Sequence, residues 1–239
     1  MKPIIIIPAR MASTRLPDKP IADIGGKPMI VRVWERAMQS GAGEVLVACD
    51  GEAIKQAVEK AGGKAVLTNP ELPSGSDRIW AALKQINSNH DVIVNVQGDM
   101  PTLDPAIIKK TLVMLENKEV DIATLASIIR DEKEVHDPAV VKVAMAESGK
   151  ALYFSRSPIP YGEGEYYHHI GIYAYRRSAL EKFVKLPPSP LEKREKLEQL
   201  RTLEAGMRID VAVVDTVPLG VDTLETLEKA RKWYDANKQ

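Results

Sequence analysis

The sequence contains a single cysteine and has no net charge, and both features exclude broad classes of protein. Cys49 alone excludes an intramolecular disulfide framework and a metal site built from several cysteines. Lysine plus arginine and aspartate plus glutamate each number 33 in 239 residues, so no overall field attracts nucleic acid or a membrane surface. We therefore expect no nucleic-acid partner, and any affinity for an anion has to come from local clusters of cations.

Long apolar runs are also lacking. No apolar stretch approaches the roughly 20 residues that a membrane-spanning helix needs, so we expect no membrane insertion. The opening MKPIIIIPAR has some features of a signal peptide, but its apolar segment is shorter than the roughly 7–15 residues of a genuine one. Pro8 and Arg10 also interrupt it. We expect a cytoplasmic protein.

Short apolar runs alternate with helical patterns over the first half of the chain. Strands are predicted at 3–9, 44–50, 64–68 and 91–99. Helices are predicted at 28–41, 52–63, 74–86 and 104–117. Four such alternations favour an α/β fold with a mostly parallel, doubly wound central sheet.

The second half has a different pattern, in which strand-like segments follow one another with few helices between them. They are DIATLASII, AVVKVAMAES, ALYFSRSPIP and HHIGIYAYRR. This pattern suggests antiparallel strands. A charged amphipathic helix is predicted at 189–206, a strand at 207–215 and a closing helix at 222–237. Without repeats or a linker, we predict a single domain over 1–239 with a smaller antiparallel β lobe.

The loop after the first strand carries a cluster of cations. Arg10, Arg15 and Lys19 lie within ten residues, with Ser13 among them. In open α/β sheets, ligands bind beyond the carboxyl ends of the strands. Arginine offers a planar fork to phosphate oxygens and lysine a point charge, so three such groups suit a triphosphate. The alternative is a solvated loop whose cations pair with nearby carboxylates.

This loop matches neither of two familiar nucleotide-binding motifs. It lacks the G-x-G-x-x-G fingerprint of dinucleotide sites and the P-loop signature G-x-x-x-x-G-K-[ST]. The chain also has no convincing Ser-His-Asp or Cys-His arrangement for nucleophilic catalysis.

Two carboxylates are candidates for a metal site. Asp99 follows a buried strand and Gly98, which allows a ligand or metal to approach closely, although an aspartate at such a turn is common for local reasons. Asp222, with Glu225 three residues later, forms a pattern like a capping box, and spacing alone favours a helix cap. A carboxylate there also suits Mg²⁺, which takes hard oxygen ligands.

Several polar residues of the second half are further candidates for a binding site. His168 and His169 are adjacent on a strand and point to opposite faces, so they do not easily share one metal ion. Tyr173 is expected on the same face as His169. Arg156, Glu198 and Gln199 are polar groups within patterned elements, and spacing alone favours exposed, solvated side chains for them.

Taken together, these segments form a pattern that resembles the 3-deoxy-manno-octulosonate cytidylyltransferases, or CMP-Kdo synthetases, almost from end to end. The segments that carry the resemblance are IIPARMASTRLPDKP, GKPMI, SGSDR, VNVQGDMP, ALYFSRSPIP, HHIGIYAYR, PSPLEKREKLEQLR and VPLGVDT. The opening PAR…R…K pattern alone is shared with CMP-sialic acid synthetases and other nucleotidyltransferases.

The resemblance implies a Rossmann-like nucleotide-diphospho-sugar transferase fold, usually as a homodimer. It implies that CTP and the sugar acid Kdo (3-deoxy-D-manno-octulosonate) give CMP-Kdo and diphosphate, with Mg²⁺ as cofactor, for lipopolysaccharide biosynthesis. In this family the anomeric hydroxyl attacks the α-phosphorus directly, which agrees with the missing nucleophilic triad. The half at 1–120 is then expected to bind CTP, and the half at 121–239 to bind the sugar and form the dimer.

The resemblance also assigns roles to individual residues. The implied nucleotide-binding residues are Arg10, Ser13, Arg15, Lys19, Ser74, Gly75, Arg78 and Gln97. The implied metal ligands are Asp99 and Asp222, which act in catalysis together with Lys19. The implied sugar-acid residues are Arg156, His169, Tyr173, Glu198 and Gln199.

One departure from the family and two alternative functions remain open. The family often has glutamate where this chain has Met100, so a third acidic group beside the metal is in doubt. Another acidic sugar, such as sialic acid or 8-amino-Kdo, is an alternative acceptor. A non-catalytic nucleotide-binding regulator is a further alternative, less favoured because Lys19, Asp99 and Asp222 are all present.

Overall fold

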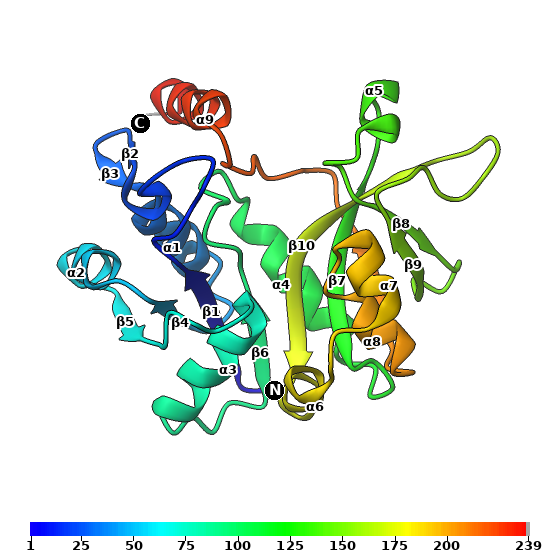
Figure 1. Ribbon diagram of the computed structural model, residues 1–239, viewed down its shortest axis with the longest axis horizontal. Helices are drawn as coiled ribbons and strands as arrows, with labels where there is room; N and C mark the ends of the chain where they lie inside the picture. The colour runs from blue at the N-terminus through cyan, green and yellow to red at the C-terminus, as the bar shows by residue number, and fades with distance from the viewer. Residues whose placement is uncertain (238–239) are drawn as a thin grey trace. The chain divides into compact units, whose positions relative to one another are not determined.

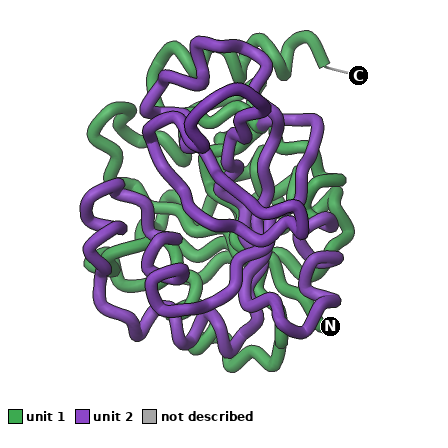
Figure 2. Tube along the Cα trace, turned by 90° about the vertical axis from the view of Figure 1, so that its right-hand side faces the viewer, with its two compact units in different colours: residues 1–108, 218–239 green, residues 109–217 purple. Residues whose placement is uncertain are grey.

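The computed structural model describes residues 1–237, which form two compact units. Unit 1 comprises residues 1–108 and the C-terminal segment from 218, and unit 2 comprises residues 109–217, as Figure 2 shows in two colours. The predicted halves, 1–120 and 121–239, differ from these units at two places, because residues 109–120 belong to unit 2 and the C-terminal segment belongs to unit 1. The number of domains stays a prediction.

Unit 1 contains a parallel sheet with the strand order β6-β1-β4-β5 (Figure 1). Its strands are β1 (Pro3–Ala9), β4 (Glu44–Cys49), β5 (Lys64–Leu67) and β6 (Val92–Asn95). The four consecutive isoleucines of β1 are fully buried, and helices of unit 1 pack against this strand. The predicted α/β class with a parallel central sheet is confirmed.

The helices predicted for unit 1 are confirmed in position. They are α1 (Met29–Gln39), α2 (Glu52–Lys60), α3 (Gly75–Gln85) and α9 (Leu224–Ala236). The predicted α4 (Pro105–Met114) begins in unit 1 and ends in unit 2. The connection between β1 and α1 also contains the 3₁₀ helix η1 (Lys19–Ile21) and a short antiparallel pair, β2 (Asp23–Ile24) and β3 (Lys27–Pro28).

A buried apolar cluster explains why the C-terminal segment belongs to unit 1. It joins the opening loop and α1 to the segment before α9 and to α9 itself. Its members are Leu16, Ile24, Met29, Val221, Leu227 and Ala230. Fully burying a leucine or methionine side chain contributes about 1.5–3 kcal/mol, so this cluster fixes the loop and the C-terminal segment to each other.

Unit 2 is built on mostly antiparallel strands, as predicted. Its strands are β7 (Ile122–Ile128), β8 (Lys142–Met145), β9 (Ala151–Ser155), β10 (Tyr167–Arg176) and β11 (Ile209–Val213). Strand β7 lies between β10, which runs antiparallel to it, and β11, which runs parallel. Strand β8 pairs antiparallel with both β10 and β9.

The helices of unit 2 differ from those that the sequence predicts. They are α5 (Glu132–His136), α6 (Arg177–Lys185), α7 (Pro190–Glu195) and α8 (Leu200–Glu204). The single helix predicted at 189–206 is wrong, because Lys196 adopts a left-handed conformation (φ 56°) that ends α7. Helices α5 and α6 lie where no element is predicted.

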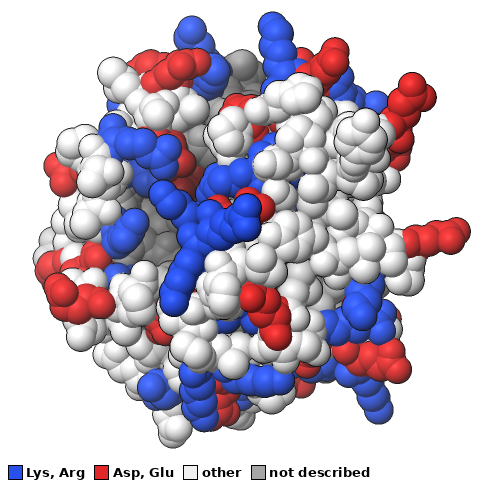
Figure 3. Space-filling view, turned by 45° about the vertical axis from the view of Figure 1, so that its right-hand side comes forward, with Lys and Arg blue, Asp and Glu red and all other residues white. Residues whose placement is uncertain are grey.

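Two further features concern the apolar character of the helices and the distribution of charged side chains. Within residues 1–237, no helix combines the length and the apolar character needed to cross a membrane. Basic and acidic side chains are interspersed over much of the face shown in Figure 3, and one denser group of lysine and arginine side chains stands out.

Candidate active site

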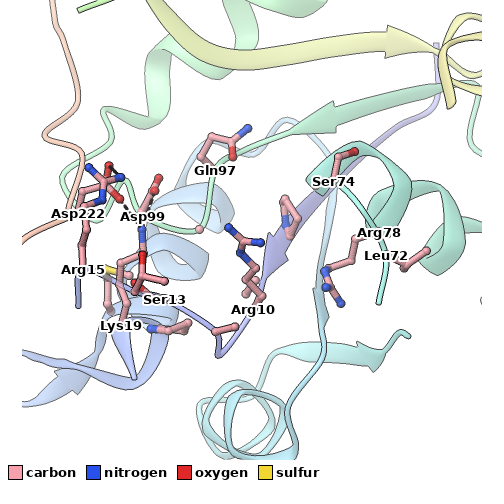
Figure 4. Close-up of a pocket in the computed structure, with 18 of the residues that line it drawn as sticks. Arg10, Ser13, Arg15, Lys19, Leu72, Ser74, Arg78, Gln97, Asp99 and Asp222 are labelled. Atoms are coloured by element: carbon pink, nitrogen blue, oxygen red, sulfur yellow. Dashed lines mark hydrogen bonds and ion pairs between the residues drawn. The ribbon is translucent and has the colours of Figure 1, made fainter. Parts of the chain in front are cut away.

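A cavity of about 440 Å³ lies in unit 1, beside the carboxyl ends of β1 and β6 (Figure 4). The loop after β1, residues 72–78, residues 97–99 and Asp222 line it. This is the edge of a parallel sheet at which ligands bind. All the residues predicted to bind nucleotide line this cavity: Arg10, Ser13, Arg15, Lys19, Ser74, Gly75, Arg78 and Gln97.

The two arginines of the opening loop differ in their partners. Arg10 is exposed and lies centrally among the residues labelled in Figure 4. The Nη2 atom of Arg15 lies 3.1 Å from Oδ2 of Asp222, with its side chain still 66% exposed. The loop itself is held by Met11, whose backbone N–H donates to Oδ1 of Asp50 at 2.8 Å. Arg15 therefore pairs with a carboxylate distant in sequence, not with a local one.

Lys19 joins the two predicted metal ligands. Its Nζ atom donates to Oδ2 of Asp99 at 3.0 Å and to Oδ1 of Asp222 at 2.9 Å, with the lysine side chain only 17% exposed. Because both carboxylate oxygens bind the same nitrogen atom, the distance between them cannot exceed the sum of these two hydrogen-bond lengths. The predicted convergence of Asp99 and Asp222 is found in the structure.

The charges in this group stabilise one another. Burial lowers the pKa of Lys19, but the charge of Asp99 and the hydrogen bonds to both carboxylates outweigh it and leave this pKa raised. Burial raises the pKa of Asp222, but the hydrogen bond from Lys19 and the charges of Lys19 and Arg15 leave it lowered. The lysine is therefore held as an ammonium and Asp222 as a carboxylate.

Backbone hydrogen bonds bring Asp222 to this site. The N–H of Val221 donates to the carbonyl of Asp99 at 2.9 Å, and the N–H of Leu219 donates to Oγ1 of Thr102 at 2.9 Å. The segment before α9 thus runs alongside the residues that follow β6. Its Val221 also belongs to the apolar cluster described for unit 1. These contacts hold the two carboxylates beside each other.

The cap predicted for Asp222 is wrong by one residue. Thr223 is the N-cap of α9, and it forms a capping box with Thr226 in place of Glu225. The Asp222 side chain therefore does not cap the helix, and it pairs with Lys19 and Arg15 instead. Its backbone N–H donates to Oγ1 of Thr226 at 2.9 Å, which fixes its position.

The start of α3 forms another wall of the cavity. Ser74 is the N-cap of α3 and accepts a hydrogen bond from the N–H of Asp77 at 3.2 Å. A Cβ atom at Gly75 would lie 3.3 Å from Cγ of Pro8, so only a residue without a side chain fits comfortably there. Arg78 is buried and bonds Oγ1 of Thr68 at 2.6 Å and Oδ2 of Asp50 at 3.4 Å.

Gly98 has a structural explanation that differs from the predicted one. A Cβ atom there would lie 2.8 Å from the carbonyl oxygen of Pro8, so the backbone of β1, not a ligand, requires the glycine. Gln97, one residue earlier, lines the cavity and donates to Oδ1 of Asn95 at 3.4 Å.

Four of the five predicted sugar-acid residues form a cluster in unit 2, in which His169 and Gln199 are buried and Tyr173 and Glu198 are half-buried. Tyr173, Glu198 and Gln199 line a cavity of only about 10 Å³, which is room for about one water molecule. The ring centroid of His169 lies 5.5 Å from that of Tyr173. These residues are close together as predicted, but the space they enclose is too small for an eight-carbon sugar. The exposed side chains that spacing alone favoured are not found for Glu198 and Gln199.

His169 is uncharged in this cluster. Its ring is buried, and burial lowers its pKa to about 3. Its Nε2 atom lies 3.0 Å from Oγ1 of Thr124, which also donates to the carbonyl of Ile172 at 2.8 Å. Burial likewise raises the pKa of Tyr173 well above its ordinary range. Both rings therefore act as neutral groups near pH 7.

An irregularity in β10 preserves the predicted alignment of these rings. His169 pairs with Ala126 on β7, and Tyr173 pairs with Thr124, so four steps on β10 match two on β7. A bulge that inserts two residues keeps the alternation of faces, because side chains alternate with a period of two. His169 and Tyr173 therefore stay on one face.

Arg156 lies apart from the other sugar-acid candidates. Its Nε atom donates to the carbonyl of Glu195 at 2.9 Å and its Nη1 atom to that of Pro138 at 2.8 Å. It does not line the cavity between Tyr173 and Gln199. Two other polar residues were not predicted: Asp50, which follows β4 and pairs with Arg78, and Thr202, which lines that cavity. The position of Asp50 after a buried strand was the signal available for it.

The residues around Lys19 fit a magnesium ion. Two carboxylates meet at one point where a cation already lies, and Mg²⁺ in nucleotide sites usually takes one or two carboxylates together with phosphates and waters. No cluster of three or more His, Cys, Asp or Glu suited to a metal occurs among residues 1–237. A magnesium site among these residues therefore has fewer than three such protein ligands, and the site around Lys19 offers two carboxylates.

Comparison with known proteins places these features in a family. The family model for cytidylyltransferases matches residues 4–209. A 3-deoxy-manno-octulosonate cytidylyltransferase of Parvibaculum lavamentivorans is 61% identical, over 96% of this chain and 91% of that protein. One of Rhodospirillum rubrum is 59% identical, over 96% of this chain and 94% of that protein.

Solved structures give the same result. The structure of a CMP:2-keto-3-deoxy-manno-octonic acid synthetase complexed with CTP has a TM-score of 0.95, with 42% identity and complete coverage of both chains. A cytidylyltransferase from Leptospira borgpetersenii, with a TM-score of 0.68 and 20% identity over all of this chain and 89% of that one, shares the fold.

Proposed function

Because the chain belongs to the 3-deoxy-manno-octulosonate cytidylyltransferases, we propose that it transfers CMP from CTP to the anomeric hydroxyl of Kdo. The hydroxyl oxygen forms a bond to the α-phosphorus of CTP and releases its proton to solvent. The bond between the α-phosphorus and the oxygen that bridges it to the β-phosphorus breaks, and diphosphate leaves with that oxygen. The product is CMP-Kdo for lipopolysaccharide biosynthesis. The observation that carries this proposal is the meeting of Arg10, Lys19, Asp99 and Asp222 in one cavity at the edge of the parallel sheet.

The cations of the opening loop bind the triphosphate. Arg10 is exposed in the cavity, and Arg15 and Lys19 line it beside the two carboxylates. Charge-assisted hydrogen bonds to phosphate oxygens are roughly twice as strong as neutral ones. The same groups offset the negative charge that grows on diphosphate as it leaves, which is the main task of a protein in such a transfer.

The wall formed by the start of α3 binds the nucleoside. Ser74, Gly75 and Gln97 face the cavity, and the buried Arg78 is held by Thr68 and Asp50. A wall fixed in this way keeps the α-phosphorus in one position relative to the acceptor, and such positioning accounts for several kcal/mol of a barrier.

Asp99 and Asp222 hold Mg²⁺ in this proposal. The ion supplies Lewis-acid neutralisation of phosphate charge when it is bound. The two carboxylates are held close together by Lys19, Arg15 and the backbone of Val221, and pairing with Lys19 and Arg15 lowers the pKa of Asp222. A third acidic ligand next to Asp99 is not available, because the following residue is Met100.

The sugar acid binds in unit 2 to the residues that the resemblance implies. These are Arg156, His169, Tyr173, Glu198 and Gln199. Because the cavity of about 10 Å³ beside Tyr173 admits about one water, the sugar enters only after side chains move. The neutral rings of His169 and Tyr173 then offer hydrogen bonds without adding charge.

Diphosphate release with CTP, Mg²⁺ and a panel of acidic sugars tests this function. Kdo is expected to give the highest kcat/KM, with CMP-Kdo as the product by mass spectrometry. A higher value with 8-amino-Kdo or sialic acid would change the acceptor but keep the enzyme class. CTP binding without diphosphate release for every acceptor would instead support a nucleotide-binding regulator.

The active protein is a cytoplasmic homodimer in this proposal. Nucleoside triphosphates are cytoplasmic substrates, and the resemblance implies a dimer. Unit 2 offers apolar side chains that a partner copy would cover, among them Leu152, 58% exposed, and Val213, 44% exposed. Light scattering during size-exclusion chromatography is expected to give twice the mass of 26.4 kDa, and a monomer mass would refute the dimer.

A further inference from the structure

We propose that Lys19 occupies the place of the metal ion in the nucleotide-free enzyme, and that metal binding therefore depends on nucleotide. This inference rests on the proposed function. The ammonium group lies between Asp99 and Asp222 until phosphates offer it another partner. Only then are both carboxylates available to a divalent cation.

The geometry of the group carries the first step. One Nζ atom lies 3.0 Å from Oδ2 of Asp99 and 2.9 Å from Oδ1 of Asp222, so a single cation bridges both carboxylates. Mg²⁺ binds oxygen ligands at about 2.0–2.1 Å and needs the same space between these oxygens. Two cations at that point repel each other strongly, because water screens like charges only weakly in a partly buried site. The ion and the lysine therefore compete.

The burial of Lys19 and Asp99 supports the competition. The side chain of Lys19 is 17% exposed and that of Asp99 is 30% exposed, so neither charge is surrounded by water. A half-buried ammonium is stable only beside anions. Lys19 accordingly stays between the carboxylates unless a second source of negative charge enters the cavity.

Triphosphate is such a source. Lys19 and Arg10 line the same cavity, and Lys19 belongs to the three-residue η1 at the end of the opening loop. Phosphate oxygens bound beside Arg10 give the flexible lysine side chain a new partner. Asp222 does not lose all its pairing when Lys19 leaves, because Arg15 remains 3.1 Å from its other oxygen. Phosphate and metal thus enter together.

Residues 1–237 contain no group of three or more His, Cys, Asp or Glu that suits a metal ion. A metal that binds the free enzyme tightly would have to displace Lys19 without help. We therefore expect weak metal binding to the free enzyme and strong coupling between metal and nucleotide.

Titration of the full chain with Mn²⁺, followed by electron paramagnetic resonance of the free ion, tests this inference. It is carried out with and without α,β-methylene-CTP, which cannot release diphosphate. For the wild type, the analogue is expected to tighten Mn²⁺ binding by at least about tenfold, within the usual range of coupling between sites. For Lys19→Met, binding without the analogue is expected to be about tenfold tighter than for the wild type, and the effect of the analogue to shrink.

Two further variants make the result specific. Lys19→Gln removes the same charge with a polar side chain, so it answers the question if the methionine variant does not fold by circular dichroism. Lys27→Met removes a lysine of unit 1 that pairs with Glu35 on α1, outside this cavity, and is expected to bind Mn²⁺ as the wild type does.

The outcomes separate the inference from the function on which it rests. Equal Mn²⁺ affinity of the wild type and both Lys19 variants without nucleotide would overturn the place-holding role, whether or not the enzyme turns over. Loss of Mn²⁺ binding in both folded variants would also overturn it. Absence of both metal and nucleotide binding in the wild type would overturn the proposed function itself.

Discussion

The two regions that carry the candidate site residues differ in the volume of their cavities and in the charge of the side chains that line them. The cavity of unit 1 has a volume of about 440 Å³, and Lys19 pairs there with the carboxylates of Asp99 and Asp222. The cluster of unit 2 encloses about 10 Å³, and burial keeps its histidine neutral. The difference indicates that the nucleotide site is formed before ligand arrives, whereas the sugar site has to open.

Replacing Asp99 by asparagine tests whether the charged cavity performs the chemistry. Asp99→Asn keeps the shape of the side chain but removes a negative charge beside Lys19. We expect kcat/KM for diphosphate release to fall by about 10²–10³, as when one electrostatic contact to a transition state is lost. The folded fraction, measured by circular dichroism, is expected to stay that of the wild type.

A matched control for this variant is Asp104→Asn. Asp104 accepts a hydrogen bond from the N–H of Ala106 before α4, a role that asparagine also performs, and it does not line the cavity. Its activity is expected to equal that of the wild type. Near-normal turnover of Asp99→Asn at saturating Mg²⁺ would refute the assignment of Asp99 as a metal ligand.

The same contrast explains how much the sequence predicts. The βα alternation of unit 1 and the loop after β1 are correctly predicted, because apolar periodicity and strand ends are local features. The lining of the cavity follows from them, since parallel strands end at one edge of the sheet. Arg10, Ser74 and Gln97 are found there for that reason.

Long-range contacts decide what the sequence does not predict. Thr223 caps α9, whereas Asp222 pairs with Lys19, which lies 203 residues away in the sequence. The break after α7 depends on a left-handed Lys196, which local propensity does not indicate. The closure of the cavity beside Tyr173 likewise depends on packing across unit 2.

The pH dependence of stability tests the neutral state of the cluster in unit 2. His169 has a pKa of about 3 in the folded chain and about 6.5 when unfolded, so between these values the unfolded chain binds the extra proton. The free energy of unfolding therefore falls as pH falls, by about 1.4 kcal/mol per pH unit. Between pH 7 and 5, the wild type is expected to lose about 2 kcal/mol more than His169→Gln.

Urea unfolding at several pH values measures this difference. The control is His136→Gln, at an exposed histidine of α5, which is expected to keep the pH dependence of the wild type. Identical acid slopes for the wild type and His169→Gln would mean that His169 is charged or exposed, and the contrast between the two regions would disappear.

Two serine caps compare the regions more finely. Ser74 caps α3 at the cavity of unit 1, and Ser189 caps α7 in unit 2. Loss of such a cap costs about 1 kcal/mol, so Ser74→Ala and Ser189→Ala are expected to lower the free energy of unfolding by similar amounts. Only Ser74→Ala is expected to raise KM for CTP. An equal rise in both variants would show that global destabilisation, not the cavity wall, controls nucleotide binding.

The smallest expected effect concerns the closed cavity itself. The hydroxyl of Thr202 lines it, is buried, and has no hydrogen-bond partner among residues 1–237. An unsatisfied buried hydroxyl lowers stability, so Thr202→Val is expected to raise the free energy of unfolding, by up to about 1 kcal/mol. Urea unfolding at pH 7 measures it, with KM for CTP unchanged. A loss of stability would mean that water satisfies the hydroxyl, so that the cavity of unit 2 is hydrated before the sugar acid arrives.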